Sequence, residues 1–272
     1  MRRFTGSRHF NFALSCAIAL ALWWILTKIY PPLVVPTIPD VAAKLAAIAA
    51  SAKLRHELWL TAFRLFLGLV LGIGAGTLAG AALGFSPRLH GIFRPLIGLM
   101  QSVPPVSWLV LALIWFGFNG KASVFIVAVG ALPVLALNIV EGVRNIDSRL
   151  LQMAAVYRFS RAKRLRDIVF PSILPYFRAG VQVAVGIGAK TVVMGEVLTT
   201  SSGIGGEITN ARLNLEPESV VAWTLVLVVL YFLLNKTAAL LLRSRADRSR
   251  NARDSQPDET LRNASGAGQS QP

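Results

Sequence analysis

Long windows without a single charged residue constrain this chain of 272 residues more than any other feature. Five such windows, each of 17 to 26 residues, cover positions 10–27, 65–87, 95–120, 122–140 and 219–235. About 20 apolar residues cross the hydrocarbon core of a membrane, so each window predicts a transmembrane helix. A sixth apolar stretch, 175–198, is interrupted by Arg178, Lys190 and Glu196. The predicted fold class is therefore an all-α, polytopic membrane protein with six transmembrane helices.

The distribution of positive charge predicts how these helices are oriented. Of the 28 Lys and Arg residues, 19 lie in segments 1–9, 85–95, 141–178 and 243–272, whereas six lie in the segments expected on the other side. Cytoplasmic loops are enriched in Lys and Arg, so both termini are predicted to be cytoplasmic. We expect an N-terminal tail at 1–9, a membrane domain at 10–242 and a polar, disordered tail at 243–272. The net charge of +15 thus predicts contact with lipid and no nucleic-acid binding, because the basic residues are not interleaved with base-stacking aromatics.

The segment 144–166 is a basic loop between two apolar stretches, and it carries seven Lys and Arg residues. Within it, Leu150, Met153, Ala154 and Tyr157 follow an i, i+3, i+4, i+7 spacing, which predicts an amphipathic helix over 150–159. An amphipathic helix just outside a membrane can dock into a groove on another protein. The loop, about 144–170, is therefore a candidate docking site for a partner subunit.

Polar and helix-breaking residues inside the predicted spans indicate a transport path. Pro104 and Pro105 remove two helix donors within the third span, and broken helices with polar neighbours often line transport sites. Ionisable residues inside a membrane face a cavity or a partner. The candidate path residues are Ser102, Trp108, Lys190 and Glu196. The alternatives are a plain kink satisfied by Ser102 or a neighbouring helix, a Lys190 side chain that snorkels, and a Glu196 side chain that reaches interfacial water near the outer end.

Three further patterns predict local structure. Five glycines, Gly68 to Gly84, recur at a spacing of four in the second span and favour close helix packing. A spacing of four drifts by about 40° per step around a straight helix, so the glycines are expected to seat more than one neighbour. Thr37 to Asp40 is typical of a capping box that starts a short surface helix. The segment Ser201–Gly206 is expected to be a flexible turn.

The sequence does not contain the motifs that several kinds of catalytic or metal-binding site require. The three histidines, His9, His56 and His90, lie outside the predicted spans, which disfavours an intramembrane Ser–His enzyme. No His/Cys cluster has metal-ligand spacing. Gly120-Lys121 lacks the other residues of a phosphate-binding loop. We therefore expect no metal, cofactor or ATPase site in this chain. A stand-alone secondary transporter or channel remains the alternative to one subunit of a larger transporter.

Several segments resemble the permease subunits of bacterial ABC importers, of the subgroup that handles nitrate, sulfonates, taurine and related small solutes. These segments are 35–39, 61–68, 102–108 with 115–117, 204–206 and the basic loop. Where the family has a Glu-Ala-Ala motif followed by Gly, this chain has Gln152-Met153-Ala154 and Arg158. Ser160, Pro171, Leu174 and Pro175 match the family. Because Arg adopts a positive φ less easily than Gly, a continuous helix is expected in place of the turn at Arg158.

The resemblance implies a type I ABC importer permease fold in the bacterial inner membrane. It implies that the basic loop forms a coupling helix that sits in a cleft of an ATPase subunit. The partners implied are two ATPase subunits, which bind ATP and Mg²⁺, a second permease copy in a homodimer, and an external solute-binding protein. The candidate coupling residues are Gln152, Met153, Ala154, Tyr157, Arg158 and Ser160.

Overall fold

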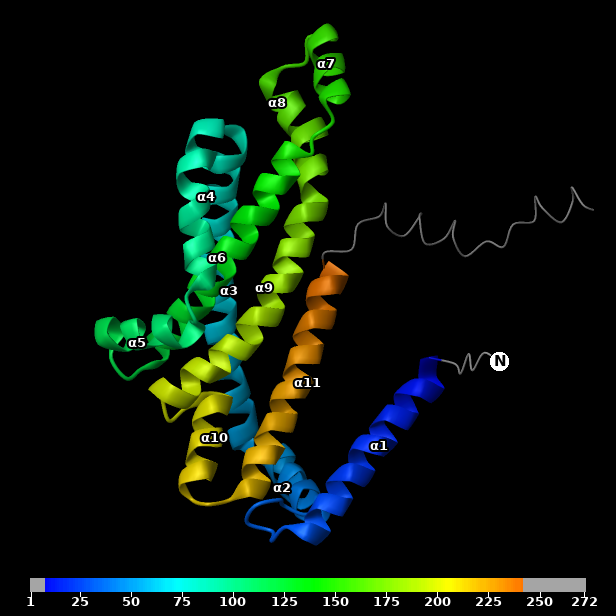
Figure 1. Cartoon of the computed structure of the whole chain (residues 1–272), viewed down its shortest axis with the longest axis vertical. Helices are drawn as coiled ribbons and strands as arrows, with labels where there is room; N and C mark the ends of the chain where they lie inside the picture. Colours follow the sequence, from blue (N-terminus) through cyan, green and yellow to red (C-terminus); the bar gives the residue numbers. More distant parts are fainter. Residues whose placement is uncertain (1–7, 242–272) are drawn as a thin grey trace, which may run out of the picture.

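The computed structural model describes residues 8–241, and every regular element in this range is helical (Figure 1). The elements are α1 (Arg8–Ile29), α2 (Ile38–Ala50), α3 (Ala52–Phe85), α4 (Pro87–Ser102), α5 (Pro105–Phe116), α6 (Gly120–Arg144), α7 (Ser148–Val156), α8 (Arg161–Arg164), a π-helical segment η1 (Leu165–Val169), α9 (Phe170–Thr199), α10 (Gly203–Leu213) and α11 (Pro217–Leu241). The predicted tail at 243–272 lies outside the described residues, as does the tail at 1–9 except for its last two residues, which begin α1.

The predicted spans correspond to helices of three kinds. Four are long and apolar enough to cross a membrane: α3, α6, the continuous stretch Arg161–Thr199, and α11 over Pro217–Ala238. A fifth is the pair α4 and α5, which is bent by 92° at the two prolines. The first predicted span corresponds to α1, whose apolar part, Ala13–Ile29, is shorter. The all-α, polytopic class is confirmed, and the predicted break in the third span is a real bend between two helices.

Helices α3 and α6 form the centre of the bundle, and the five spaced glycines lie at their contact. A Cβ atom added to any of these glycines would lie within 3 Å of α6, at Val127, Ala131, Leu135, Ile139 or Val143 in turn. Both helices advance by four residues between contacts, so they run parallel. The expectation that the glycines would seat several neighbours is wrong. The glycines recur every four residues, which is more than the 3.6 residues of one helical turn. When two helices wind around each other in a right-handed sense, such a repeat keeps facing the same partner helix.

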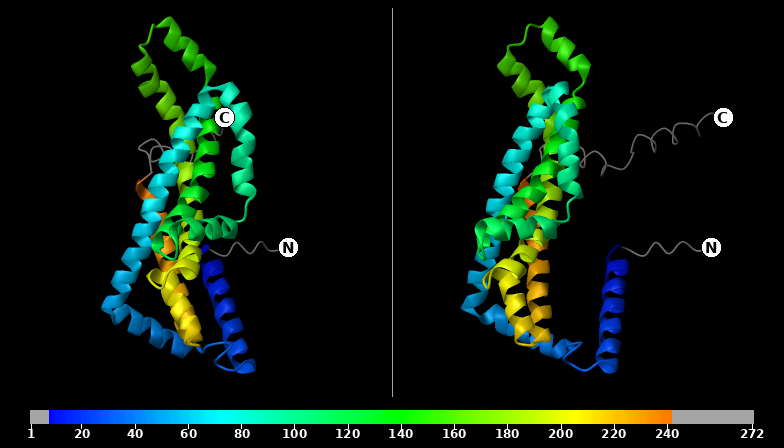
Figure 2. Two further views of the ribbon diagram at one scale, coloured as in Figure 1. Left: turned by 90° about the vertical axis from the view of Figure 1, so that its left-hand side faces the viewer. Right: turned by 60° about the vertical axis from the view of Figure 1, so that its left-hand side comes forward.

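The two ends of the bundle carry different elements. Helices α7 and α8 project at one end, beside the start of α4, whereas α2 and α10 lie at the opposite end (Figures 1 and 2). Helix α1 stands apart from the other helices in Figure 1 and in the right view of Figure 2. The Thr37 hydroxyl accepts a hydrogen bond from the Asp40 N–H at the start of α2, which confirms the predicted cap. The bundle therefore has an end with the basic loop and an end with two short surface helices.

Candidate translocation groove and docking loop

A hollow of about 290 Å³ lies where the bent pair α4–α5 meets α6 and α9. Pro104 and Pro105 have no N–H groups, so they cannot donate to the carbonyl oxygens of Met100 and Gln101, four residues earlier. Non-helical backbone at membrane depth persists where it lines a cavity. The hollow is lined by Met100, Gln101, Val103, Pro105, Trp108, Ile126, Val129, Gly130, Pro133, Val134, Ile187 and Thr191. The break thus leaves the carbonyl oxygens of Met100 and Gln101 without their usual helical donors, beside a hollow that is otherwise mostly apolar.

The structure brings one of the four predicted path residues, Trp108, to this hollow. Trp108 lines it, and its indole Nε1 is buried without a hydrogen-bond partner. Lys190 is exposed on α9, three residues after Ile187, which lines the hollow. Ser102 is exposed and is not among the lining residues. Its hydroxyl donates to the Gly98 carbonyl oxygen at 3.0 Å, within α4. An unpaired buried donor such as the Trp108 N–H calls for an acceptor, which a polar solute would bring.

Glu196 lies away from this hollow, at the centre of a buried polar network, and its residue is 0% exposed. Arg64 Nη1 donates to its Oε1 at 2.7 Å, and Thr61 Oγ1 donates to its Oε2 at 2.8 Å. The Gly205 N–H donates to Oε2 at 3.0 Å. A buried charge requires a paired charge and hydrogen bonds, and Glu196 has both. The alternative that Glu196 reaches interfacial water is therefore wrong. Its place in the translocation path stays a prediction, and it does not line this hollow.

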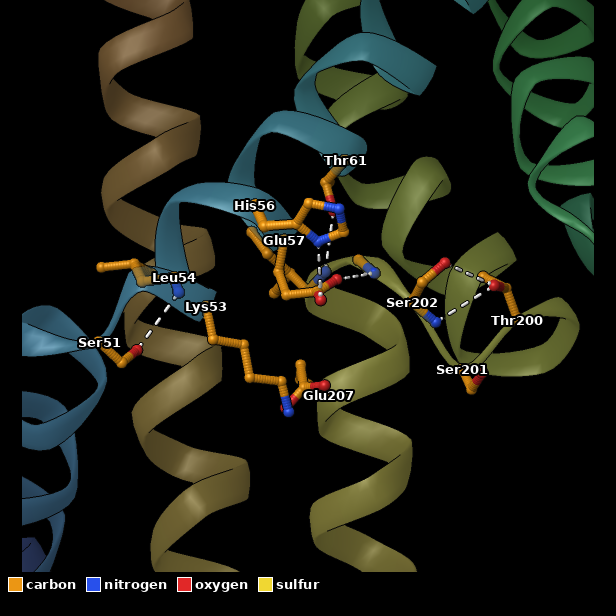
Figure 3. Close-up of polar contacts among 12 residues, drawn as sticks. Ser51, Lys53, Leu54, His56, Glu57, Thr61, Thr200, Ser201, Ser202 and Glu207 are labelled. Carbon is orange, nitrogen blue, oxygen red and sulfur yellow. Dashed lines mark hydrogen bonds and ion pairs between the residues drawn. The ribbon is translucent and has the colours of Figure 1, made fainter.

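The same network holds the start of α10 (Figure 3). The N–H of Gly203 donates to Glu57 Oε2, and the N–H of Ile204 donates to Thr61 Oγ1 at 2.9 Å. The first N–H groups of a helix have no partner within that helix, so side chains from α3 and α9 supply the caps. Gly203 has a φ of 86°, a conformation that suits glycine. The predicted flexible turn at 201–206 is wrong, because Gly203 to Gly206 are buried in the first turn of α10.

Sequence reasoning missed the residues that hold Glu196. Arg64 also binds the Ser202 carbonyl oxygen at 3.0 Å and the Ser202 hydroxyl at 2.8 Å. Lys53 pairs with Glu207 at 2.7 Å beside the network. One sequence signal could have found them. A carboxylate inside a span needs a positive charge, so a cation at the same depth in another span is its expected partner. Arg64, near the start of the second span, is such a cation.

The docking loop is formed by α7, a turn and α8, and it projects from the bundle. The Asp147 side chain caps α7 by accepting from the Arg149 N–H at 2.8 Å. Arg158 has a φ of 51°, and the N–H groups of Arg158 and Phe159 donate to the carbonyls of Ala155 and Ala154. This is a Schellman motif, which usually has Gly at the left-handed position. The predicted continuous helix is therefore wrong: Arg158 occupies the turn conformation in place of Gly.

The loop presents part of its predicted stripe to the outside. Tyr157 is 71% exposed, and Met153 and Gln152 are also exposed. Ala154 is only 2% exposed, so it packs inside the loop and does not offer surface to a partner. Ser160 caps α8 by accepting from the Lys163 N–H at 3.3 Å. The exposed surface of α7 and its C-terminal turn is therefore apolar and aromatic, with arginines around it.

Comparison with known proteins places this architecture in a family. Residues 68–248, about two thirds of the chain, match the model of the family described as "Binding-protein-dependent transport system inner membrane component". The chain belongs to this family. It is therefore a permease component of an ABC importer and not an enzyme, as predicted.

Individual relatives agree with this assignment. The chain is 30% identical over 221 residues to the putative aliphatic sulfonates transport permease protein SsuC of Escherichia coli (strain K12), covering 81% of each chain. It is 29% identical over 225 residues to the taurine transport system permease protein TauC of the same organism, covering 80% of this chain and 82% of the relative. The fold resembles an inward-facing structure of the MetNI methionine ABC transporter, with a TM-score of 0.61, 17% identity, and coverage of 70% of this chain and 94% of the other. The type I importer permease fold is thus confirmed.

Proposed function

We propose that this chain, with a second copy, forms the path by which a small anionic or zwitterionic solute, of the sulfonate, taurine or nitrate type, enters the cell. The observation that carries the proposal is the hollow at the α4–α5 break, with its unpaired Trp108 N–H and the Gln101 side chain. Both groups can hydrogen-bond an oxyanion, and Lys190, exposed on α9 next to the lining residue Thr191, would add a positive charge. The relatives named above act on sulfonates and taurine, which supports this class of solute.

The hollow is open to the outside of a single chain, and a second copy would close it. The two helices of the bent pair, α4 and α5, also expose large apolar side chains, including Leu96, Val106, Val110 and Ile114. An exposed apolar surface beside a polar hollow suits contact with a second permease copy as well as lipid. In a homodimer, two such hollows would face each other and form one central path. Glu196, in contrast, serves to fix the outer ends of α3, α9 and α10.

The docking loop would couple this path to two ATPase subunits. Their closure on ATP would move α7, and the rigid α6 and α9 on either side of the loop would transmit the movement to the hollow. Such coupling requires that the ATPases bind the two states of the permease differently. A separate binding protein would deliver the solute at the end with α2 and α10, and the loop end would face the cytoplasm together with both termini. Basic residues at the loop end support this orientation.

The test is uptake of radiolabelled taurine and of a small alkanesulfonate into vesicles that contain the permease, its partner ATPase and its binding protein. We expect uptake that requires ATP and the binding protein and that survives collapse of the proton gradient. Uptake that persists without ATP while a proton gradient is intact would instead show a stand-alone secondary transporter.

A further inference from the structure

A second hollow, of about 220 Å³, follows the same groove toward the docking-loop end of the bundle. On α4 it is lined by His90, Arg94 and Gly98, which share one face at a spacing of four. On α6 it is lined by Leu137, Val140, Glu141 and Arg144. Because both hollows lie between α4 and α6, a solute moving along the groove from the α4–α5 break would meet this second hollow next. We call it the basic hollow.

The basic hollow contains a buried polar group without a partner. His90 is 7% exposed, and both of its ring nitrogens are buried without a hydrogen bond. The sequence had placed His90 in a loop outside the spans, whereas the structure includes it in α4. Buried polar atoms are nearly always paired, so an unpaired imidazole that lines a hollow indicates a missing ligand. A neutral imidazole offers one N–H donor to such a ligand.

The charges around His90 determine which ligand fits. Arg94 and Arg144 are exposed at the rim, and among the described residues no hydrogen bond or ion pair involves either guanidinium. Both arginines lie close enough to His90 to act on it electrostatically. Glu141 is the one acidic residue of the lining, so positive charge is in excess. Planar guanidinium groups suit oxyanions, to which they can donate two parallel hydrogen bonds.

We propose that the basic hollow binds a small oxyanion of the sulfonate or phosphate type, carried by the solute as it leaves the path. His90 would donate one hydrogen bond from the buried side, and Arg94 and Arg144 would hold the charge from the two helices. Glu141 would limit the affinity, so that the solute can leave for the cytoplasm. This inference rests on the proposed function for the source of the anion, and it adds an exit site at the end of the path.

Space in the hollow allows a test without a change of charge. A Cβ atom on Gly98 would meet no atom within 4 Å, so a larger side chain can enter the hollow without disturbing the helices. Gly98→Leu would fill the site, whereas Arg94→Gln with Arg144→Gln would remove its charge. A control pair, Arg88→Gln with Arg55→Gln, removes two exposed arginines that neither line the hollow nor belong to the docking loop.

The measurement is equilibrium binding of radiolabelled methanesulfonate to the permease–ATPase complex in phosphatidylcholine nanodiscs. We expect saturable binding that weakens at least tenfold in the Gly98→Leu variant and in the Arg94/Arg144 pair, and less than twofold in the control pair. Native-like binding by the Arg94/Arg144 pair would overturn the proposal. A second result would also overturn it: the complex binds no methanesulfonate, but it retains phosphatidylglycerol and loses that lipid when Arg94 and Arg144 are replaced. The occupant of the hollow would then be a lipid headgroup. ATP-driven uptake by the same complex reports separately on the proposed function.

Discussion

Replacement of Gly76 by Ala tests the packing of α3 on α6 most sharply. A Cβ atom at Gly76 would lie 2.5 Å from the Leu132 carbonyl oxygen and 2.8 Å from Leu135 Cβ. Carbon atoms in good contact lie about 3.5–4.0 Å apart, so the helices would have to separate. Overpacking of this kind costs about 1–3 kcal/mol. The same change at Gly74, which has no atom within 4 Å of its Cβ position, should stabilise the protein by up to about 1 kcal/mol through helix propensity.

The two variants should therefore differ in unfolding free energy by about 1–4 kcal/mol, although they lie two residues apart on one helix. Unfolding in mixed micelles with increasing denaturing detergent, followed by tryptophan fluorescence, measures this difference. Equal stability of the Gly76→Ala and Gly74→Ala variants would refute the parallel α3–α6 contact as the centre of the fold.

Three other changes test the loop, the buried network and the ion pair between Lys44 and Glu216. Arg158→Gly should stabilise the isolated permease by about 1 kcal/mol, because Gly adopts the left-handed turn without strain, and thermal unfolding in detergent measures it. Arg64→Met should destabilise by about 3 kcal/mol or more, since its carboxylate partner would stay buried and unpaired; a melting temperature like that of the native protein would contradict this role. The pKa of Glu216 is lowered, first by a hydrogen bond from the Ser219 hydroxyl and then by Lys44. The ionised carboxylate therefore stabilises the protein at pH values above its unfolded pKa of about 4.5. This stabilisation is lost as the pH falls through the lowered pKa. Because both Lys44 and Glu216 are 40% exposed, Glu216→Gln should remove less than about 1 kcal/mol of this pH dependence in unfolding titrations.

Features that depend on the membrane itself could be predicted from the sequence. The apolar windows predicted the long helices, because a backbone surrounded by lipid must make its hydrogen bonds within the protein, as an α-helix does. Pro104 and Pro105 predicted the break in the third span, because neither residue has an N–H to donate to a helical hydrogen bond. The basic residues between the fourth and fifth apolar stretches predicted the loop that contains α7 and α8, whereas the docking of this loop to an ATPase stays a prediction.

Features that depend on a partner helix could not be predicted from spacing alone. The angular drift of Gly68 to Gly84 was worked out for a straight helix, whereas α6 winds with α3 and keeps every glycine in contact. Arg158 was judged by its intrinsic preference, whereas three backbone hydrogen bonds in the turn at Tyr157, Arg158 and Phe159 fix its conformation. The segment after Thr199 looked flexible because it was considered without Glu57, Thr61 and Glu196, which accept hydrogen bonds from the N–H groups of Gly203, Ile204 and Gly205.

The central claim is that the tip of the docking loop contacts an ATPase subunit. A photo-crosslinking amino acid at position 157, in place of the exposed Tyr157, tests it directly when the permease is co-expressed with its co-encoded ATPase. Leu213, 69% exposed at the opposite end of the bundle, is the matched control position. The account predicts a crosslink to the ATPase from position 157 and none from position 213. A crosslink from position 213 alone, or from neither position in a complex that still co-purifies, would contradict it.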